Sequence, residues 1–401
     1  MTTTPTSDQT SARKVDRGDT EVGCPVERGP DGVWRVRGYA AGRVLLRATD
    51  TRQAGLGIDQ NENLPKSYRR PVLYRDGAEH REHRRQTAKF FTPRRVSEQY
   101  RAMMERITDE LINDLQRRRS AQLSEVSFHL AVEVTATIIG LTERRAGLDR
   151  RLDRFFPEGP LGTPGLTSLH GLKWTYIQLR NFMSIYLMDV RPSVRARRRE
   201  RRDDLISHLL DEGCTPLEIL GECITIGAAG MVTTREFINV VAWHFFTTPA
   251  LAARYLVAAE AERYAILHEL LRLEPVVGNL KRRTVSDVDV PGVDGPVTIP
   301  AGELVDVAVS AANLDSAGVG GDPGAVCPGR AIAEGAYPQG LSFGDGAHKC
   351  PGAHIALQET DIFLLRLFSE PGLRMTQAPR VTMKPEISGY ELRGLEVTLE
   401  G

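Results

Sequence analysis

One cysteine of the chain lies in a setting that could do chemistry. Cys350 falls within the run Phe343-Gly-Asp-Gly-Ala-His-Lys-Cys-Pro-Gly352. The glycines of this run allow the backbone to turn tightly around a ligand. We expect a helix to begin near Cys350, and a helix N-terminus stabilises a thiolate. A lone cysteine is usually an inert core residue, but this setting favours a thiolate that ligates a metal.

Two pairs of charged or polar side chains have helical spacing. Glu269 and Arg272 lie at positions i and i+3, so both fall on one helix face and can form a buried ion pair, although a surface salt bridge has the same spacing. His80 and Arg84 lie at i and i+4, so a helix aims both side chains in one direction. Arginine suits a bidentate contact with an anion. Without a ligand, the same pair would be an exposed basic face.

These motifs follow one another in the order of a known family. The run Phe343-Gly-x-Gly-x-His-x-Cys-x-Gly352 resembles the haem-binding signature of the soluble bacterial cytochromes P450, and Glu269-Leu-Leu-Arg272 resembles their ExxR element. The stretch Cys327-Pro-Gly-Arg330 resembles the segment whose arginine completes the same ion network. The resemblance covers nearly all of residues 30–401. It implies haem b as the cofactor, with the Cys350 thiolate as axial iron ligand.

The resemblance also implies which side chains hold the haem. Phe343 and Gly352 belong to the cofactor-binding loop that carries Cys350. Haem propionates are anionic and need cationic donors. By motif position, the family supplies these donors from His80, Arg84, Arg283 and His348. The residues expected to hold the proximal structure through ion pairs are Glu269, Arg272 and Arg330.

The central apolar helix departs from the family at one position. Ala229-Gly-Met-Val-Thr233 aligns with a motif that usually reads Ala-Gly-x-acid-Thr, so Val232 occupies the place of the acid. Gly230 and the Thr233 hydroxyl are expected to loosen the helix over the haem and leave room for dioxygen. The acid normally helps to relay protons, which valine cannot carry. The predicted catalytic residues are Ala229, Gly230, Val232 and Thr233.

Two reactions remain open after this departure. In the first, solvent or a substrate group relays protons through Thr233, and the enzyme hydroxylates its substrate. In the second, the oxidant removes electrons or hydrogen atoms from an aromatic substrate, and the radicals couple into a C–C or C–N bond. The alternative of another class is a non-catalytic haem protein that binds or senses a small molecule, which the missing acid makes conceivable.

Two further departures lie on the cysteine side of the haem. Pro351 stands where the family commonly has an apolar residue with a backbone N–H. Because amides just after the cysteine point at its sulfur, proline removes one donor, and we expect a more electron-rich thiolate. The simpler interpretation is that Pro351 only begins the helix. Cys327 stands where the family often has Asp, and we expect a buried thiol without a function there.

Position in the family predicts a mostly apolar substrate pocket. Its walls would be the segment before Pro71, residues 155–185, the central helix, the stretch after the ExxR element and the turn Ser388-Gly-Tyr390. The individual candidates are Met231, Val276, Val277, Asn279 and Tyr390. Such a pocket suits an aromatic or polycyclic natural product, or a cyclic dipeptide. The resemblance therefore implies oxidative tailoring of a small secondary metabolite.

Enzymes of this kind depend on electrons from outside. The resemblance implies NAD(P)H as the source and a ferredoxin as the carrier. Basic residues near the cysteine side would attract an acidic ferredoxin by complementary charge. The candidate positions are Arg84, Arg85 and Lys349.

The composition excludes several other classes of protein. The 401 residues include 52 Lys plus Arg and 52 Asp plus Glu, so the charge gives no reason to propose nucleic acid or an anionic membrane as partner. The five cysteines form no CxxC pair, which argues against a disulfide framework and a structural zinc site. The polar N-terminus has no signal-peptide core and no apolar run is long enough for a membrane span, so we expect a cytoplasmic enzyme.

The elements that must position these residues are mostly helices. We expect residues 1–20 to form a disordered tail and residues 21–401 a single catalytic domain. Apolar residues at three- and four-residue spacing predict helices from His80 to Glu274. Within this region, the arginine-rich stretch Arg195–Arg202 is most simply a solvated interhelical segment.

The C-terminal third has a different texture. Short β-rich runs between turn signals predict small hairpins over 285–309 and strands over 381–399. A Gly-rich stretch without regular structure, 316–340, and a helix from Cys350 to Phe368 lie between them. The fold class is therefore mainly α with small β-sheets. The resemblance implies the triangular helical prism of the cytochrome P450 fold, with the haem between the central long helix and the cysteine loop.

Overall fold

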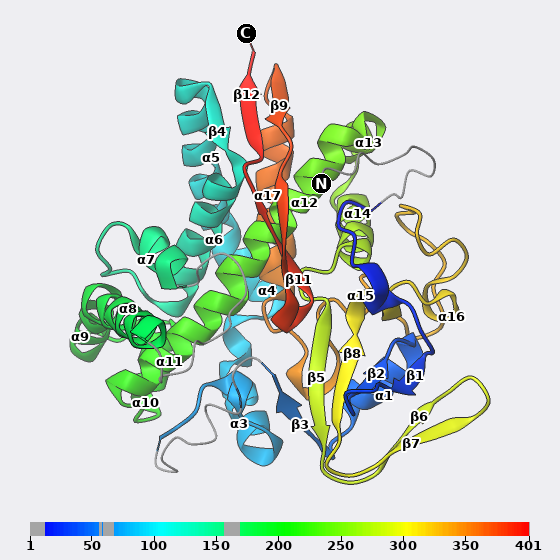
Figure 1. The fold of residues 1–401 in the computed structure, drawn as a ribbon. Coiled ribbons are helices and arrows are strands. Elements are labelled where there is room, and N and C mark those ends of the chain that lie inside the picture. Colours follow the sequence, from blue (N-terminus) through cyan, green and yellow to red (C-terminus); the bar gives the residue numbers. More distant parts are fainter. Residues whose placement is uncertain (1–12, 56–57, 59–67, 156–168, 401) are drawn as a thin grey trace.

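A long helical column crosses the molecule, and the other helices pack around it (Figure 1). It consists of α11 (Pro216–Gly227), a π-helical turn (Ala228–Val232) and α12 (Thr233–Thr247). The structure is a computed structural model that describes residues 13–55, 58, 68–155 and 169–400. The column begins where it does because Thr215 and Glu218 form a capping box around Pro216.

Helices on both sides of the column supply most of the core. Those that precede it in the chain are α1 (Tyr39–Arg47), α3 (Gly77–Thr87), α4 (Pro93–Arg95), α5 (Arg101–Arg118), α6 (Leu123–Ile139), α7 (Leu148–Phe155), α8 (Leu169–Ile185), α9 (Arg191–Arg199) and α10 (Leu205–Asp211). Those that follow it are α13 (Pro249–Val257), α14 (Glu260–Leu273), α15 (Val309–Ala312), α16 (Ser316–Val319) and α17 (Ala353–Phe368).

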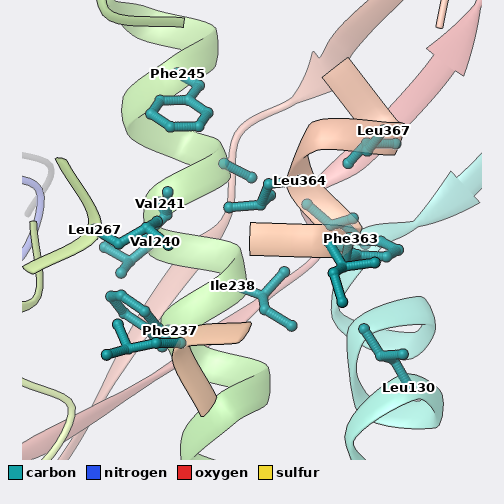
Figure 2. Close-up of a cluster of buried hydrophobic side chains, with 14 of the residues drawn as sticks. Leu130, Phe237, Ile238, Val240, Val241, Phe245, Leu267, Phe363, Leu364 and Leu367 are labelled. Carbon is teal, nitrogen blue, oxygen red and sulfur yellow. The ribbon is translucent and has the colours of Figure 1, made fainter. Parts of the chain in front are cut away.

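The largest hydrophobic cluster lies where α6, α12, α14 and α17 meet. Figure 2 shows Ile238 on the side of α12 that faces Phe363 and Leu364 of α17, whereas Phe237 lies on the other side with Val240 and Leu267. These side chains are all almost completely buried. Burial of such large apolar groups contributes roughly 1.5–3 kcal/mol each, so this contact fixes α17 against the central column.

The strands form small sheets at the periphery. They are β1 (Val26–Arg28), β2 (Trp34–Val36), β3 (Thr51–Ala54), β4 (Ser120–Gln122), β5 (Asn279–Thr284), β6 (Val288–Pro291), β7 (Pro296–Ile299), β8 (Leu304–Ala308), β9 (Leu373–Gln377), β10 (Arg380–Lys384), β11 (Gly389–Arg393) and β12 (Glu396–Leu399). The five-stranded sheet has the order β1-β2-β8-β5-β3 and joins the N-terminal region to the region after α14. The other sheets are β4-β12-β9, β10-β11 and the projecting hairpin β6-β7 (Figure 1).

The predicted fold class is confirmed. The hairpins expected over 285–309, the strands expected over 381–399 and the helix that ends at Phe368 are all present. The Gly-rich stretch 316–340 contains one short helix, α16, that the sequence did not suggest, because the Asp315 side chain caps it by accepting from the Ala317 N–H.

The N-terminal segment is ordered over part of the expected tail. Residues 1–12 lie outside the described residues, but Val15 is 1% exposed and packs in the largest cluster. Arg17 is also buried, and its guanidinium donates to the carbonyls of Pro275 and Ser388. The prediction of a tail up to residue 20 is therefore wrong for residues 13–20, because two buried side chains anchor this segment.

The prediction of a solvated interhelical segment holds only in part for the arginine-rich stretch Arg195–Arg202, in which five of the six arginines are exposed. Its first half belongs to α9, and Arg197 is 1% exposed. The Arg197 guanidinium donates to Asp204 at 2.5 Å and to the Gly140 carbonyl at 3.2 Å. A buried arginine with two such acceptors fixes the corner between α9 and α10 and is not a solvated side chain.

The column is also apolar enough to satisfy a length-and-composition test for a membrane span. This holds for the stretch Pro216–Thr247, with a mean hydropathy of 1.3 in its most apolar window. The lengths of the apolar runs in the sequence predict no such span. Core helices of globular proteins pass the same test, and here the buried Arg235 and Glu236 form an ion pair at 2.9 Å on α12. We interpret the column as a core helix because its sides pack against α6 and α17.

Candidate active site around Cys350

The loop before α17 carries Cys350 on a tightly turned backbone. The Cys350 N–H donates to the Phe343 carbonyl at 2.8 Å, which closes the loop. Gly344 and Gly346 both have positive φ angles, 67° and 66°. A Cβ at Gly346 would lie 2.3 Å from the Leu46 carbonyl oxygen, so only glycine fits there. The predicted tight turn around the cysteine is present.

The Cys350 sulfur accepts hydrogen bonds from the amides of Gly352 and Ala353, and the Arg84 guanidinium lies close enough to act on it. Burial nevertheless raises the pKa of the Cys350 thiol above its ordinary value, and these donors oppose the rise only in part. The deprotonated sulfur therefore needs a cation, such as a metal ion, to be favoured. Part of the residue is accessible to solvent, as a ligand of an inserted group must be.

The central column distorts where the sequence predicted. Ala228–Val232 is a π-helical turn, and the Thr233 hydroxyl donates to the Ala229 carbonyl at 2.5 Å. Ala229 is exposed within this turn, whereas Thr233 is half-buried. A Cβ at Gly230 would lie 3.3 Å from the Thr135 hydroxyl of α6, so glycine allows the two helices to approach closely. The loosened helix is thus present.

Val232 gives this turn no titratable group. Its side chain is half-buried and packs against the cluster formed by α6 and α11. A carboxyl group that the sequence analysis missed lies on α17 instead. Glu359 is 1% exposed, it accepts a hydrogen bond from the Thr234 side chain, and burial raises its pKa to about 8. Thr234 follows Thr233 in the chain. The Glu359 carboxyl group, which is protonated near pH 7, therefore contacts the residue next to the distorted turn.

Cationic and imidazole side chains gather beside the cysteine loop. The rings of His80 and His348 stack with their centroids 4.0 Å apart, and the His348 Nε2 lies 3.0 Å from the Asp76 carboxylate. Arg84 donates to the Lys349 carbonyl at 2.7 Å. Burial, followed by the charges of His348 and Arg84, lowers the pKa of His80 to about 4, so its ring is neutral near pH 7.

This cluster has more donors than acceptors. The Nδ1 atom of His80 is buried and has no partner among the described residues, and among those residues Arg84 pairs with no carboxylate. An anionic group placed there would satisfy both. The residues present therefore fit the propionates of a haem whose iron is held by Cys350.

The assignment of Arg283 to this cluster is corrected. Arg283 is exposed, and its guanidinium donates to the Gly302 carbonyl at 3.0 Å. Arg282 points to the other face of β5, is 3% exposed, and has its pKa lowered to about 10 by burial, with the Asp76 charge opposing. Side chains alternate along a strand, so the two arginines cannot share a face. Arg282 and Thr284 share the buried face of the strand, and Arg283 between them faces outward, so the register of β5 and not the motif position selects the arginine.

The ion network around the ExxR element is present. Arg272 donates to both carboxylate oxygens of Glu269 at 2.8 Å, and Arg330 donates to Glu269 at 3.0 Å. Arg272 also donates to the carbonyls of Asn313 and Pro323, which ties α14 to the segment before the cysteine loop. Removing one member of such a buried group leaves an unpaired charge, so the three residues act together.

Cys327 contributes to this network through its backbone. Its N–H donates to Glu269 at 2.9 Å, while the side chain is exposed. The expectation of a buried thiol was therefore wrong. Since the contact uses only the backbone, residue 327 is free to be Cys where the family often has Asp.

Most of the individual pocket candidates lie in the core. Met231 and Val276 are buried in hydrophobic clusters, and the buried Tyr390 hydroxyl donates to the Glu274 carbonyl at 3.0 Å. The Asn279 side chain donates to Asp306 at 3.0 Å, and only Val277 is half-buried. Family position alone does not say which side of a helix or turn faces a pocket. The expected walls at 59–67 and 156–168 lie outside the described residues.

The basic candidates for docking a ferredoxin all have partners. Arg84 is directed to the Lys349 carbonyl, and Arg85 pairs with Glu82 at 2.6 Å. The Lys349 ammonium lies 3.8 Å from the centre of the Tyr337 ring. Arg85 is the most exposed of the three, so its ion pair is the easiest to exchange for another.

Comparison with known proteins agrees with this geometry. Residues 264–388 match the family model described as Cytochrome P450. The chain is 29% identical to Cytochrome P450 107B1 of Saccharopolyspora erythraea over 77% of this chain and 72% of that protein. It is 28% identical to Nocardicin C N-oxygenase of Nocardia uniformis subsp. tsuyamanensis, over 77% of this chain and 74% of that protein.

Solved structures show the same fold. The crystal structure of CYP105P1 in complex with 4-phenylimidazole has a TM-score of 0.74 at 26% identity, covering 94% of both chains. P450 EryK in complex with erythromycin B has a TM-score of 0.73 at 23% identity, covering 94% of this chain and 93% of that chain. The fold in which Cys350 and its surroundings are placed is therefore shared over nearly the whole chain.

Proposed function

Because the chain belongs to the cytochrome P450 family and is an oxidoreductase of that family, we propose that it oxidises a small apolar or aromatic secondary metabolite by oxygen insertion. The observation that carries this proposal is the environment of Cys350. Its sulfur accepts two backbone hydrogen bonds beside a group of donors that has a surplus for an anion. When bound, a haem would supply the activation of dioxygen, as its thiolate ligand favours O–O cleavage.

The protein's own residues would divide the remaining work. Cys350 would ligate the iron, and His80, Arg84, Arg282 and His348 would hold the propionates. The ion network of Glu269 would keep the cysteine loop in place from α14. Thr233 would orient a proton at its hydroxyl, which already has a fixed acceptor in the Ala229 carbonyl.

Relatives support oxygen insertion as the reaction. They include the Erythromycin C-12 hydroxylase of Saccharopolyspora erythraea and the Mycinamicin IV hydroxylase/epoxidase of Micromonospora griseorubida, each 28% identical to this chain. Val232 is the observation that favours the second candidate, radical coupling of aromatic groups. A product heavier than its substrate by one oxygen atom would support insertion. A product lighter than its combined substrates by two hydrogen atoms would support coupling instead.

Electron supply is a further part of the proposal. We infer NAD(P)H as the source and an acidic ferredoxin as the carrier, in a cytoplasmic enzyme. Reduction by a ferredoxin should slow as ionic strength rises, because salt screens the attraction between surface charges. A rate that does not depend on salt would argue against an electrostatic docking site.

The experiment for the family chemistry is direct. The purified protein should bind haem and give the Soret shift of a thiolate-ligated ferrous carbon monoxide complex, and Cys350→Ser should lose that shift while keeping its fold. The alternative of a non-catalytic sensor predicts binding of a small molecule without NADPH consumption. Product formation in step with NADPH consumption would exclude the sensor.

A further inference from the structure

Two carboxylates of α11 hold the backbone of the segment that precedes α3. The Arg69 N–H donates to Glu218 at 2.8 Å, and the Val72 N–H donates to Glu222 at 2.9 Å. Glu218 and Glu222 are four residues apart, so they lie on one face of the helix. The segment 68–75 therefore lies along α11 and is bound to it at two points.

Gly221, between these carboxylates, permits the close approach. A Cβ at this position would lie 2.7 Å from the Tyr68 hydroxyl and 3.2 Å from the Pro71 ring. The first distance is shorter than real side-chain contacts allow. An added methyl group would push the Tyr68 hydroxyl aside and press on the Pro71 ring, so the missing side chain at residue 221 favours the close approach of the segment to α11.

Glu222 occupies an unusual environment for a carboxyl group. It is 3% exposed, and its second oxygen has no partner among the described residues. The His83 Nε2 of α3 lies 3.4 Å away, and the Arg75 guanidinium lies 3.9 Å away. Burial raises the pKa of Glu222 to about 7, against the opposing effects of Arg75 and the Val72 N–H. Burial lowers the pKa of His83 to about 4, so the shared proton belongs to Glu222.

Several other charged groups surround Glu222 and His83. Arg75 pairs with Glu79 at 3.5 Å, and the charges of His208 and Arg84 act on His83. Although burial acts to raise it, the pKa of Glu218 is lowered by the N–H groups of Arg69 and Thr215, so Glu218 stays charged near neutral pH. Glu222 is therefore the member of this group that changes its charge near pH 7.

We propose that Glu218, Gly221 and Glu222 form a clasp that positions the segment 68–75 on α11 and thereby controls the admission of a small molecule to the site above Cys350. The three are positioning residues, since they act through the segment. The inference rests on the proposed function, because that function makes the segment a wall of the substrate pocket.

The opening of the segment 68–75 should depend on pH, because the closed and open states bind the Glu222 proton with different affinities. In the open state Glu222 would be in water, where its pKa returns to its ordinary value of 4.5. The closed state then binds the proton more tightly, so opening becomes easier as pH rises from about 4.5 to about 7 and is constant above that. Glu222→Gln keeps an oxygen for the Val72 N–H and cannot ionise, so it should stay closed at every pH. Glu222→Leu has no acceptor and should stay open.

Hydrogen exchange of the haem-loaded protein tests the clasp itself. After correction for intrinsic rates, amides of 68–75 in the wild type should exchange about tenfold faster at about pH 8 than at about pH 6. Glu222→Gln should remain protected at both pH values, and Gly221→Ala should be unprotected at both. The matched control is Gly227→Ala in the same helix, where an added Cβ meets only Met231, at an ordinary 3.5 Å. Equal protection of wild type and Glu222→Gln at both pH values would overturn the clasp.

Ligand binding tests the control of admission. The probe is 4-phenylimidazole, and the measurement is its association rate with the haem-loaded protein. At about pH 8 the association should be severalfold slower in Glu222→Gln than in the wild type, and the difference should shrink as the pH falls toward about 4.5. If exchange shows the clasp but the association rates do not differ, admission control is refuted. Since exchange reports on the segment whether or not any substrate is oxidised, failure of the clasp is distinct from failure of the proposed function.

Discussion

The Cys350 sulfur accepts hydrogen bonds from the backbone amides of Gly352 and Ala353, the two residues that follow Pro351. Proline itself has no N–H, so this loop offers the sulfur fewer donors than a loop with leucine at that position. Hydrogen bonds to a ligating thiolate withdraw charge from it and favour the reduced metal. The electron density on the sulfur therefore depends on one residue whose side chain need not touch the ligand.

Pro351→Leu should raise the haem reduction potential by roughly 40 mV, since one hydrogen bond contributes about 1 kcal/mol. Spectroelectrochemical titration measures this directly. Ala353→Gly serves as the control, because it retains the N–H that donates to the sulfur. An unchanged or lower potential in Pro351→Leu would mean that the proline only begins the helix.

Glu359 gives a second prediction at the residue scale. Its pKa, raised by burial to about 8 from 4.5, means that the folded protein binds this proton more tightly than the unfolded chain. The stabilisation from this protonated group is therefore full below about pH 4.5 and is lost as pH rises to about 8, by about 5 kcal/mol in total. Glu359→Gln should not lose this part of its stability.

Urea unfolding at about pH 6 and about pH 9 measures the difference between the two proteins. Glu110→Gln is the matched control, because Glu110 pairs with Arg106 on the exposed face of α5. If wild type and Glu359→Gln lose stability equally across this range, the buried carboxyl is not the group that titrates.

At the scale of elements, the register of β5 decides which arginine faces inward, toward the residues proposed to hold the haem propionates. β5 is hydrogen-bonded on both sides, with Arg282 opposite Gln53 of β3 and Val305 of β8. A shift by one residue would turn Arg282 outward and Arg283 inward. Both neighbouring strands hold the register, so the two arginines form a natural pair of test and control.

Arg282→Ala should lose haem at least about tenfold faster than wild type. The substitution removes a buried cation beside the residues proposed to hold the propionates, His80, Arg84 and His348. Arg283→Ala should retain haem as wild type does, because its side chain donates outward to the Gly302 carbonyl. The rate of haem transfer to a scavenging protein measures both. Equal loss in the two variants would show that overall charge, and not the inward position, matters.

Sequence patterns predicted elements better than side-chain directions. The spacing of Glu269 and Arg272 fixed their shared helix face, and the ion pair is there. The same reasoning fails for Met231 and Tyr390, since a family motif gives a position in the chain but not the side that packs into the core. Arg197 shows the complementary limit, because a charge-rich run does not reveal which arginine will find a buried acceptor.

At the scale of the whole molecule, the first described residues bind to segments far along the chain. Arg17 donates to Pro275 and Ser388, and its guanidinium carbon lies 5.5 Å from the centre of the Tyr390 ring. Contacts between residues 258 and 371 positions apart leave no periodic signal. For this reason motif order predicted the fold, while the anchoring of the N-terminal segment could not be predicted.

Arg17→Ala should destabilise the protein by about 2–4 kcal/mol, because two buried carbonyls lose their donor and the vacated space stays unfilled. Arg28→Ala is the control, since Arg28 makes an exposed pair with Glu303 and should change stability by less than about 0.5 kcal/mol. Thermal unfolding compares the two. A loss in Arg17→Ala no larger than in the control would mean that the segment contributes little to the fold.

The anchoring of residues 13–17 also sets an order of events during synthesis. A ribosome releases this segment well before its acceptors at Pro275 and Ser388, which follow it by 258 and 371 residues. The Arg17 side chain therefore stays without these acceptors until residues 275 and 388 have been synthesised. A polypeptide that terminates before residue 388 would lack the Ser388 acceptor, so its segment 13–17 would stay incompletely anchored.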